Sequence, residues 1–154
     1  MPPGPPPVSE LTAHLGFWLR AVSNHVSHAF SGRLAQRDVT VAEWVVLRAL
    51  YGRAPVPPSR LAADMGLTRG AITKLADRLI AKGLVARAAS AEDGRAQTLA
   101  LTGAGGALVP ELAALADQND AECFAPLAAA ERATLERLLR RLVEHRAIAG
   151  WPMT

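Results

Sequence analysis

Hydrophobic residues in the middle of the chain follow the repeat of two short helices separated by a tight turn. The first run ends at Gly66, which can adopt the positive φ that a sharp turn between helices requires. In the second run the apolar positions recur at steps of three, four and one residue and line one helix face: Ile72, Leu75, Leu79 and Ile80. Gly83 ends this pattern. We therefore expect a helix–turn–helix over residues 59–83.

Capping and turn-forming residues mark where these elements begin and end. Ser59 follows two prolines and is expected to cap the first helix, and Thr68 is expected to cap the second. Beyond Gly83, apolar runs at residues 84–85 and 98–101 lie on either side of an Asp-Gly pair, which favours a tight β-hairpin turn. The central segment therefore predicts helix, turn, helix and hairpin in direct succession.

Amphipathic patterns also precede the central segment. Residues 9–31 are expected to form a helix that Ser9 can cap. Its apolar positions recur at steps of four and three, close to a heptad seam: Leu11, Leu15, Trp18, Val22, Val26 and Ala29. Thr40 and Glu43 have the spacing of a capping box and predict the start of a second helix.

Two further helices are expected after the hairpin. Thr102 can cap the first of them, and Pro110 within it predicts a kink or a late start. Pro126 marks the next break. The last helix is expected over residues 128–147, with an apolar stripe that consists of Leu135, Leu138, Leu139, Leu142 and Val143.

Positive charge is concentrated in the central segment. Residues 60–95 contain seven basic and four acidic residues, a net charge of +3 that equals the net charge of the whole chain. Duplex DNA would be attracted to this segment, and binding would weaken with salt because counterions are released. A basic run can also be no more than a solvated helix face. Here, however, it coincides with the elements that place one helix in the major groove and a hairpin on the adjacent backbone.

The expected DNA contacts follow from the positions of the polar side chains. Arg69 lies on the exposed face of the second helix and is the best candidate for a bidentate contact to guanine. Arg95 is expected to enter the minor groove or clamp the backbone, with Asp93 holding its orientation. Ser59 and Arg60 are placed for phosphate contact. The full set of candidate DNA-binding residues is Ser59, Arg60, Thr68, Arg69, Thr73, Lys74 and Arg95.

Length and composition limit the possible classes of protein. The 154 residues suit a single domain or one domain plus an assembly module, and with only 5% aromatic residues the core should consist mainly of Leu, Val and Ala. Residues 1–8 are rich in proline, lack the features of a secretory signal, and are expected to form a disordered tail. No apolar run approaches the roughly 18–20 residues of a membrane helix. The single cysteine suits a reducing compartment, so we expect a cytoplasmic protein without membrane contact.

Three features of the central segment are also found together in a known family. They are the run SRLAADMGLTRGAITKLADRLIAKGLVAR, the Asp93-Gly94-Arg95 wing and the closing LALTGAG. With them the segment resembles the winged helix-turn-helix of MarR-family transcriptional regulators. The run VTVAEWVVLRAL at residues 39–50 resembles the helix that precedes the motif in that family, and the similarity extends over residues 10–146. The resemblance implies a mostly α fold with a small β-hairpin wing.

The patterns and the resemblance together predict how the chain is divided. Residues 35–102 would form the winged helix-turn-helix, and residues 9–34 and 103–150 a helical dimerisation module. In a monomer the apolar stripes of that module would stay in water, at a cost of about 25 cal/mol per Å². We therefore expect a homodimer, as the resemblance also implies. Its two recognition helices would read a pseudo-palindromic operator with half-sites about one helical turn apart.

The resemblance further implies that a chemical signal releases the protein from DNA, and promoter occlusion favours repression over activation. Relatives commonly bind the signal, such as a small aromatic acid, in the cleft between the DNA-binding lobes and the dimer helices. Trp18 and Trp44 could line an aromatic pocket there, with His14 or Arg48 as its polar anchor. The favoured alternative is that both tryptophans are simply core residues.

Metal and oxidant sensing have weaker support in the sequence. His25 and His28 could share a metal ion, but no cysteine or carboxylate cluster surrounds them, so surface or interface histidines are favoured and no metal site or cofactor is expected. Peroxide-sensing relatives carry their reactive cysteine near the N-terminal helix, whereas Cys123 lies just before Pro126. A packed structural cysteine is therefore favoured over a redox switch.

Two other classes of protein are alternatives to a DNA-binding regulator. An enzyme is not expected, because the sequence has no nucleophile–base pair, no phosphate-binding glycine loop before a lysine, and no paired carboxylates beyond Glu92-Asp93. The alternative function is a winged-helix module for protein–protein contact. Such modules usually lose the basic exposed face, which Arg69, Lys74 and Arg95 retain here.

Overall fold

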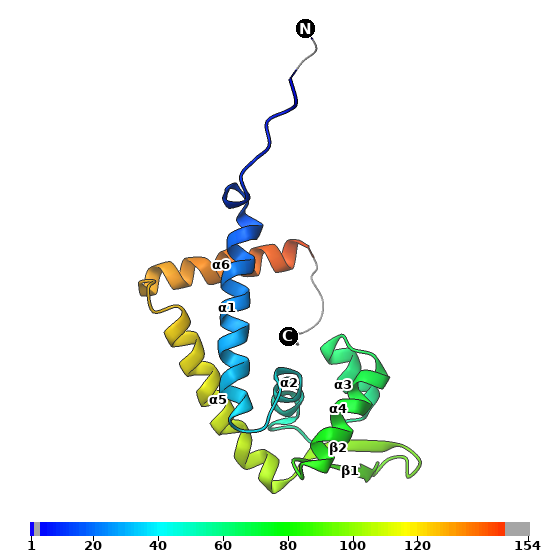
Figure 1. Cartoon of the computed structure of the whole chain (residues 1–154). Coiled ribbons are helices and arrows are strands. Elements are labelled where there is room, and N and C mark those ends of the chain that lie inside the picture. The colour runs from blue at the N-terminus through cyan, green and yellow to red at the C-terminus, as the bar shows by residue number, and fades with distance from the viewer. Residues whose placement is uncertain (2–3, 147–154) are drawn as a thin grey trace.

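A computed structural model describes residues 1 and 4–146, and these fold into helices with one β-hairpin. In chain order the elements are the 3₁₀ turn η1 (Leu11–Ala13), α1 (Leu15–Ala35), α2 (Val41–Leu50), α3 (Pro58–Met65), α4 (Arg69–Ala81), β1 (Val85–Ala89), β2 (Gln97–Leu101), α5 (Gly103–Cys123) and α6 (Ala129–His145). The long helices α1 and α5 lie side by side, and α3, α4 and the hairpin form the opposite side of the molecule (Figure 1). The predicted fold class, mostly α with a hairpin wing, is confirmed.

Local side-chain bonds and glycines define the helix–turn–helix as expected. Thr68 caps α4, because its Oγ1 accepts a hydrogen bond from the Ala71 N–H at 3.1 Å. Gly66 ends α3 with φ 67°, and Gly83 follows α4 with φ 72°, a region of backbone space that glycine adopts without strain. The turn between the helices and the end of the second helix are therefore confirmed.

Two predicted helix starts are wrong. Ser59 does not cap α3, which begins one residue earlier at Pro58 with Pro57 as its N-cap. A proline suits the first helical position because its φ is fixed near the helical value and it has no N–H to satisfy. Ser9 does not cap the first helix either, since α1 begins only at Leu15. Residues 9–14 are exposed, and without packing a short helix is not stable in water.

The start of α5 is fixed by the residue that was expected to cap it. Thr102 Oγ1 accepts from the Gly105 N–H at 3.1 Å and donates to the Gly83 carbonyl at 2.6 Å, which fastens the first turn of α5 to the end of the recognition segment. The helix then continues through Pro110. The predicted late start is therefore wrong, because the cap and its docking decide where the helix begins. Residues 147–150 of the predicted C-terminal module lie outside the described residues.

The hairpin has the expected strands but a longer connection. Strands β1 and β2 pair antiparallel, with Val85 opposite Leu101 and Ala89 opposite Gln97. Residues 90–96 join them, so the connection that contains the Asp-Gly pair is longer than a tight turn. The reason lies in local polar bonds: Ser90 Oγ accepts from the N–H groups of residues 92 and 93, which shapes a wider loop.

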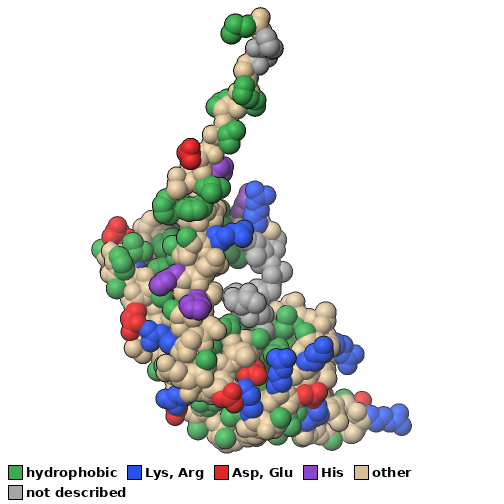
Figure 2. Space-filling model, viewed as in Figure 1, with side chains coloured by type: hydrophobic (Ala, Val, Ile, Leu, Met, Phe, Trp, Pro, Cys, Tyr) green, Lys and Arg blue, Asp and Glu red, His purple; other side chains and the backbone are tan. Residues whose placement is uncertain are grey.

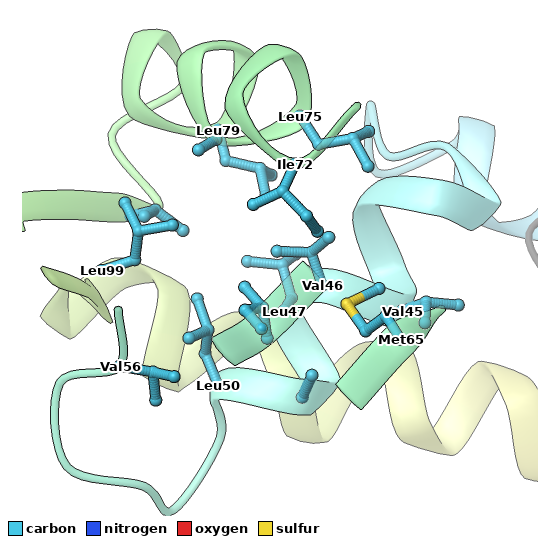
Figure 3. Close-up of a cluster of buried hydrophobic side chains, with 14 of the residues drawn as sticks. Val45, Val46, Leu47, Leu50, Val56, Met65, Ile72, Leu75, Leu79 and Leu99 are labelled. Carbon is cyan, nitrogen blue, oxygen red and sulfur yellow. The ribbon is translucent and has the colours of Figure 1, made fainter. Parts of the chain in front are cut away.

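The core lies where α2, α3, α4 and the hairpin meet. Ile72 and Leu79 of α4 point toward Val46 and Leu47 of α2 (Figure 3). Apart from Ile72 and Met65, the buried apolar residues are Leu, Val and Ala, as the composition predicted. This core fixes α4 with one face inward and leaves its other face to solvent.

A polar joint holds α1 against α5. Asn119 is only 3% exposed, and its side chain accepts from Arg33 Nε at 3.2 Å and donates to the Val26 carbonyl at 3.3 Å. Arg33 also pairs with Glu122. The hydrogen bond from Gln118 and the nearby Arg33 guanidinium hold the pKa of Glu122 below its ordinary value. These bonds keep α5 in register with α1.

The first turn of α5 allows a matched test of its packing. A Cβ at Gly105 would lie 2.1 Å from the Leu84 carbonyl oxygen, whereas a Cβ at Gly106 would meet nothing within 4 Å. Gly105→Ala should lower the free energy of unfolding by about 3 kcal/mol or more through overpacking. Gly106→Ala should raise it by up to about 1 kcal/mol through helix propensity. Chemical denaturation measures both, and equal stability of the two variants would contradict the close approach.

Candidate nucleic-acid interface

Helix α4 presents a polar face to solvent. Its inward face is almost fully buried and consists of Ile72, Leu75, Ala76 and Leu79. The outward face is exposed and consists of Arg69, Gly70, Thr73, Lys74 and Asp77. The sequence folds this way because its apolar positions repeat at the helical period, so all of them can enter the core at once. The outward face is therefore available for a partner.

Ion pairs separate the basic residues of this region into two groups. Lys82 pairs with Glu43, and Arg87 pairs with Asp77 at 2.9 Å, which joins strand β1 to α4. The other basic side chains between residues 58 and 101 have no carboxylate partner among the described residues: Arg60, Arg69, Lys74, Arg78 and Arg95. Figure 2 shows Lys and Arg side chains gathered over the side of the molecule that carries α3, α4 and the hairpin. These five unpaired cations, which we call the basic face, are free to neutralise phosphates.

The hydroxyl candidates differ in how much of their bonding capacity is used. Thr68 Oγ1 accepts the cap bond described above. Thr73 Oγ1 donates to the Arg69 carbonyl at 2.9 Å, so it can still accept but its donor is occupied. Ser59 is exposed and is not engaged as a cap, so its hydroxyl can donate or accept. Ser59 and Thr68 can therefore each still donate to a phosphate, whereas the donor of Thr73 is occupied.

The loop of the hairpin holds Arg95 at an exposed turn. Asp93 Oδ1 accepts from the Arg95 backbone N–H at 3.0 Å, and the Asp93 carbonyl accepts from the Ala96 N–H at 3.0 Å. Asp93 thus orders the backbone that carries Arg95, and it does so without pairing with the guanidinium among the described contacts. Arg95 is left exposed on a loop that projects from the body of the molecule (Figure 1).

Sequence reasoning missed three features of this interface. Arg78 belongs to the basic face, and its spacing of four residues from Lys74 was a signal that could have placed it there. The pairing of Arg87 with Asp77 joins residues 10 apart in sequence on different elements. The ammonium of Lys82, at the end of α4, binds Glu43, 39 residues away. Neither ion pair follows from local spacing.

A cavity of about 380 Å³ lies between α1, α2 and α5, away from the basic face. It is lined by Val26, Ser27, Phe30, Val41, Trp44, Val45, Arg48, Ala116, Asn119 and Asp120. Trp44 packs edge-to-face on Phe30 with ring centroids 6.4 Å apart. Two of the four candidate ligand residues, Trp44 and Arg48, therefore share an apolar cavity with a charged rim.

The structure does not bring Trp18 and His14 to that cavity. Trp18 is 53% exposed, and its Nε1 donates to the Thr12 carbonyl at 2.9 Å. His14 is exposed at the start of α1, with Nδ1 3.3 Å from the Leu11 carbonyl oxygen. Trp18 lies eight residues before Val26, which is about 12 Å along a helix axis. The simple core role favoured for both tryptophans is also wrong for Trp18 in this chain.

Two apolar helix surfaces are exposed on the single chain. One lies on the first half of α1 and on η1, with Leu11, Leu15, Phe17, Trp18, Leu19 and Val22 each at least 40% exposed. The other is on α6, where Leu138, Leu139, Leu142 and Val143 are each at least 37% exposed. No residue of α6 is buried. Contiguous apolar surfaces of this kind mark sites of association.

The residues considered for metal binding and for oxidation form no clear site in the described part of the chain. Within residues 1 and 4–146, no three His, Cys, Asp or Glu side chains come together as a metal site would require. His25 and His28 are exposed, and Cys123 is half-buried with a free thiol. None of the described helices is long and apolar enough to cross a membrane.

Comparison with known proteins decides the family. A family model described as MarR family matches residues 37–96. The multiple antibiotic resistance protein MarR of Escherichia coli is 31% identical over 130 residues, which cover 84% of this chain and 90% of that protein. An HTH-type transcriptional repressor of Mycobacterium tuberculosis is also 31% identical, over 84% of this chain and 94% of the relative. The chain belongs to the MarR family.

Solved structures of MarR-family proteins have the same fold. A mutant of E. coli MarR complexed with operator DNA aligns with a TM-score of 0.74 and 30% identity, over 84% of this chain and 93% of that chain. BpsR of Bordetella bronchiseptica, whose DNA binding is regulated by 6-hydroxynicotinic acid, aligns with a TM-score of 0.75 and 26% identity, over 88% of this chain and 97% of that chain. The predicted MarR-family winged helix and the class of transcriptional regulator are therefore confirmed.

A substitution in the exposed loop of the wing tests the basic face directly. Arg95→Ala should weaken binding to duplex DNA about tenfold and lower the salt slope by about one per protomer, because one phosphate contact is lost. It should leave the free energy of unfolding unchanged, since Arg95 is exposed. Fluorescence anisotropy at several salt concentrations measures both the affinity and the slope. Arg137→Ala on α6 removes the same charge elsewhere, and an equal loss in that control would remove Arg95 from the interface.

Proposed function

We propose that this MarR-family regulator represses transcription by binding a pseudo-palindromic operator as a homodimer. The observation that carries the proposal is the basic face, five unpaired cations that span α3, α4 and the wing. Protein that occupies a promoter excludes polymerase, which favours repression. The M. tuberculosis relative named as a transcriptional repressor, and the E. coli MarR mutant solved with operator DNA, support the same function.

In the proposed complex, α4 enters the major groove and the wing lies on the adjacent backbone. Arg69 at the start of α4 is placed for a bidentate contact to guanine, with Lys74 and Thr73 one turn further along the same exposed side. Ser59 and Arg60 at the start of α3 contact phosphates, and Thr68 contacts the backbone next to the helix it caps. Arg95 reaches the minor groove or the sugar–phosphate backbone.

The homodimer is proposed from the two apolar helix surfaces. A groove of about 690 Å³ runs along α6 beside the end of α5, and Leu135, Leu139 and Val143 form part of its wall. The apolar surface at the start of α1 has the chemistry to fill such a groove on a second copy. Burial of both surfaces removes the exposed leucines from water at about 25 cal/mol per Å².

The signal is proposed to be a small aromatic acid that enters the cavity beside α2. Phe30 and Trp44 offer aromatic walls, and Arg48 at the rim can bind a carboxylate. The relative regulated by 6-hydroxynicotinic acid shows that a compound of this class can act on a similar fold. Trp18 and His14 take no part in this proposal, because they lie outside the cavity.

Salt dependence separates this function from the protein-contact alternative. The chain would select duplexes from a random-sequence library, and anisotropy would measure their binding at two salt concentrations. A DNA-binding regulator gives specific binding with a negative salt slope. Failure to select any duplex, together with no salt slope, would favour a protein-contact module.

Disruption of the α6 surface tests the homodimer. Leu142 belongs to the apolar stripe and is 55% exposed, so Leu142→Glu should place a charge in the proposed interface. We expect the dissociation constant of the dimer to rise about 100-fold or more, with loss of operator affinity. Sedimentation velocity measures the change. Ala130→Glu adds the same charge to an exposed position on the other side of α6, and dissociation by both variants alike would argue against this interface.

A thermal-shift screen with phenolic and other aromatic acids tests the effector site. A binder at about 100 times its dissociation constant should stabilise the folded protein by roughly 2.7 kcal/mol. Arg48→Gln should abolish the shift, because the neutral amide cannot pair with the carboxylate. An acid that stabilises the wild type and Arg48→Gln equally would place its site elsewhere.

A further inference from the structure

Helix α2 has two faces with different neighbours. One face lines the cavity through Val41, Trp44, Val45 and Arg48. The opposite face carries Val46, Leu47 and Leu50, each no more than 2% exposed, in the core that also holds Ile72 and Leu79 of α4. At 100° per residue these two sets lie on opposite sides of one helix. Helix α2 therefore separates the cavity from the recognition helix.

A buried carboxylate on the core side of α2 binds the end of α4. Glu43 is 2% exposed, and its Oε2 accepts from the Thr40 N–H at 3.0 Å and from Lys82 Nζ at 2.9 Å. Lys82 is the C-cap residue of α4. Its ammonium also donates to the Asp38 carbonyl at 2.5 Å, at the corner between α1 and α2. Asp38 has φ 55°, a conformation that few non-glycine residues adopt.

This ion pair differs in kind from the contacts around it. The leucine and valine contacts between α2 and α4 are non-directional, so they resist separation of the helices more than sliding or rotation. A charge-assisted hydrogen bond to a buried carboxylate is directional, and its loss leaves a charge without a partner in the interior. The pair therefore adds, between the end of α4 and α2, a directional contact that the apolar core lacks.

We propose that Glu43 and Lys82 are positioning residues for DNA binding, and that they couple the cavity on one side of α2 to the recognition helix on the other. The proposal rests on the proposed function, because it assigns a route by which an occupant of the cavity changes operator affinity. An occupant pushes on α2, and α4 follows because Lys82 is held by Glu43. Neither residue touches DNA in this account.

The sign of the Glu43→Gln effect distinguishes positioning from electrostatics. Removal of a negative charge should strengthen DNA binding if only the net charge matters. The positioning role predicts that Glu43→Gln weakens binding about fivefold to a duplex that the wild type selects from a random library. Glutamine keeps the cap bond to the Thr40 N–H, so α2 is retained. Asp117→Asn removes a charge from an exposed residue of α5 and should not weaken binding.

The affinity and salt slope of Lys82 variants provide a second test of the positioning role. Lys82→Met should weaken binding about fivefold with an unchanged salt slope, because Lys82 makes no phosphate contact. Lys82→Arg keeps a cation that can donate to Glu43 and should restore affinity to within about twofold. Circular dichroism and thermal melting confirm that each variant is folded. A salt slope reduced by about one per protomer in Lys82→Met would show a phosphate contact and overturn the positioning role.

The coupling between the cavity and α4 can be tested without a known ligand. A large side chain introduced into the cavity wall takes the place of the ligand. Ala116→Phe on α5 and Ser27→Phe on α1 fill the cavity from two walls that are not part of α2. Each should weaken operator binding about tenfold in the wild-type background but less than about twofold in Lys82→Met, because the pair that transmits the push is absent.

Different outcomes would overturn the coupling, the positioning role or the proposed function. Equal losses from cavity filling in both backgrounds, or no loss in the wild type, would overturn the coupling while operator binding stands. Tighter binding by Glu43→Gln would overturn the positioning role. A wild-type chain that selects no duplex would instead remove the proposed function, and the positioning role with it.

Discussion

Burial of the apolar face of α4 is the constraint on which the rest of the structure depends. Ile72, Leu75 and Leu79 can enter the core only if the helix is held against α2, and this orientation turns Arg69 and Lys74 outward. The core thus decides which side chains can reach a nucleic acid, although none of its residues does so itself. The basic side chains of this region then fall into two groups. Lys82 and Arg87 form ion pairs that hold elements together, and the unpaired cations make up the basic face.

Much of this architecture could be predicted from the sequence, because its signals are local. Thr68 and the two glycines Gly66 and Gly83 define the recognition segment through a cap bond and two positive φ angles, each set by one residue type. Two of the failed predictions depend on structure that is not local in sequence. The start of α5 depends on docking of Thr102 against Gly83, 19 residues earlier, which overrides the expectation from Pro110. Trp18 and Trp44 share no site, because the spacing along α1 carries Trp18 beyond the cavity.

The same distinction applies to the functional surface. Amphipathic periodicity was sufficient to place the outward residues of α4, but it could not show which cations are unpaired. The bond between Lys82 and Glu43 spans 39 residues and joins a helix end to a buried carboxylate on another helix. Through such a contact the position of the recognition helix depends on α2, and α2 also lines the cavity. DNA recognition and signal reception would then meet in one helix of ten residues.

The central claim is that two copies of α4, paired through the terminal helices, read one duplex together. Selection of duplexes from a random library by the purified full-length chain, followed by sequencing, tests it most directly. We expect an inverted repeat whose half-sites are centred about 10 base pairs apart, one helical turn. A single unrepeated site, or a direct repeat without two-fold symmetry, would contradict it.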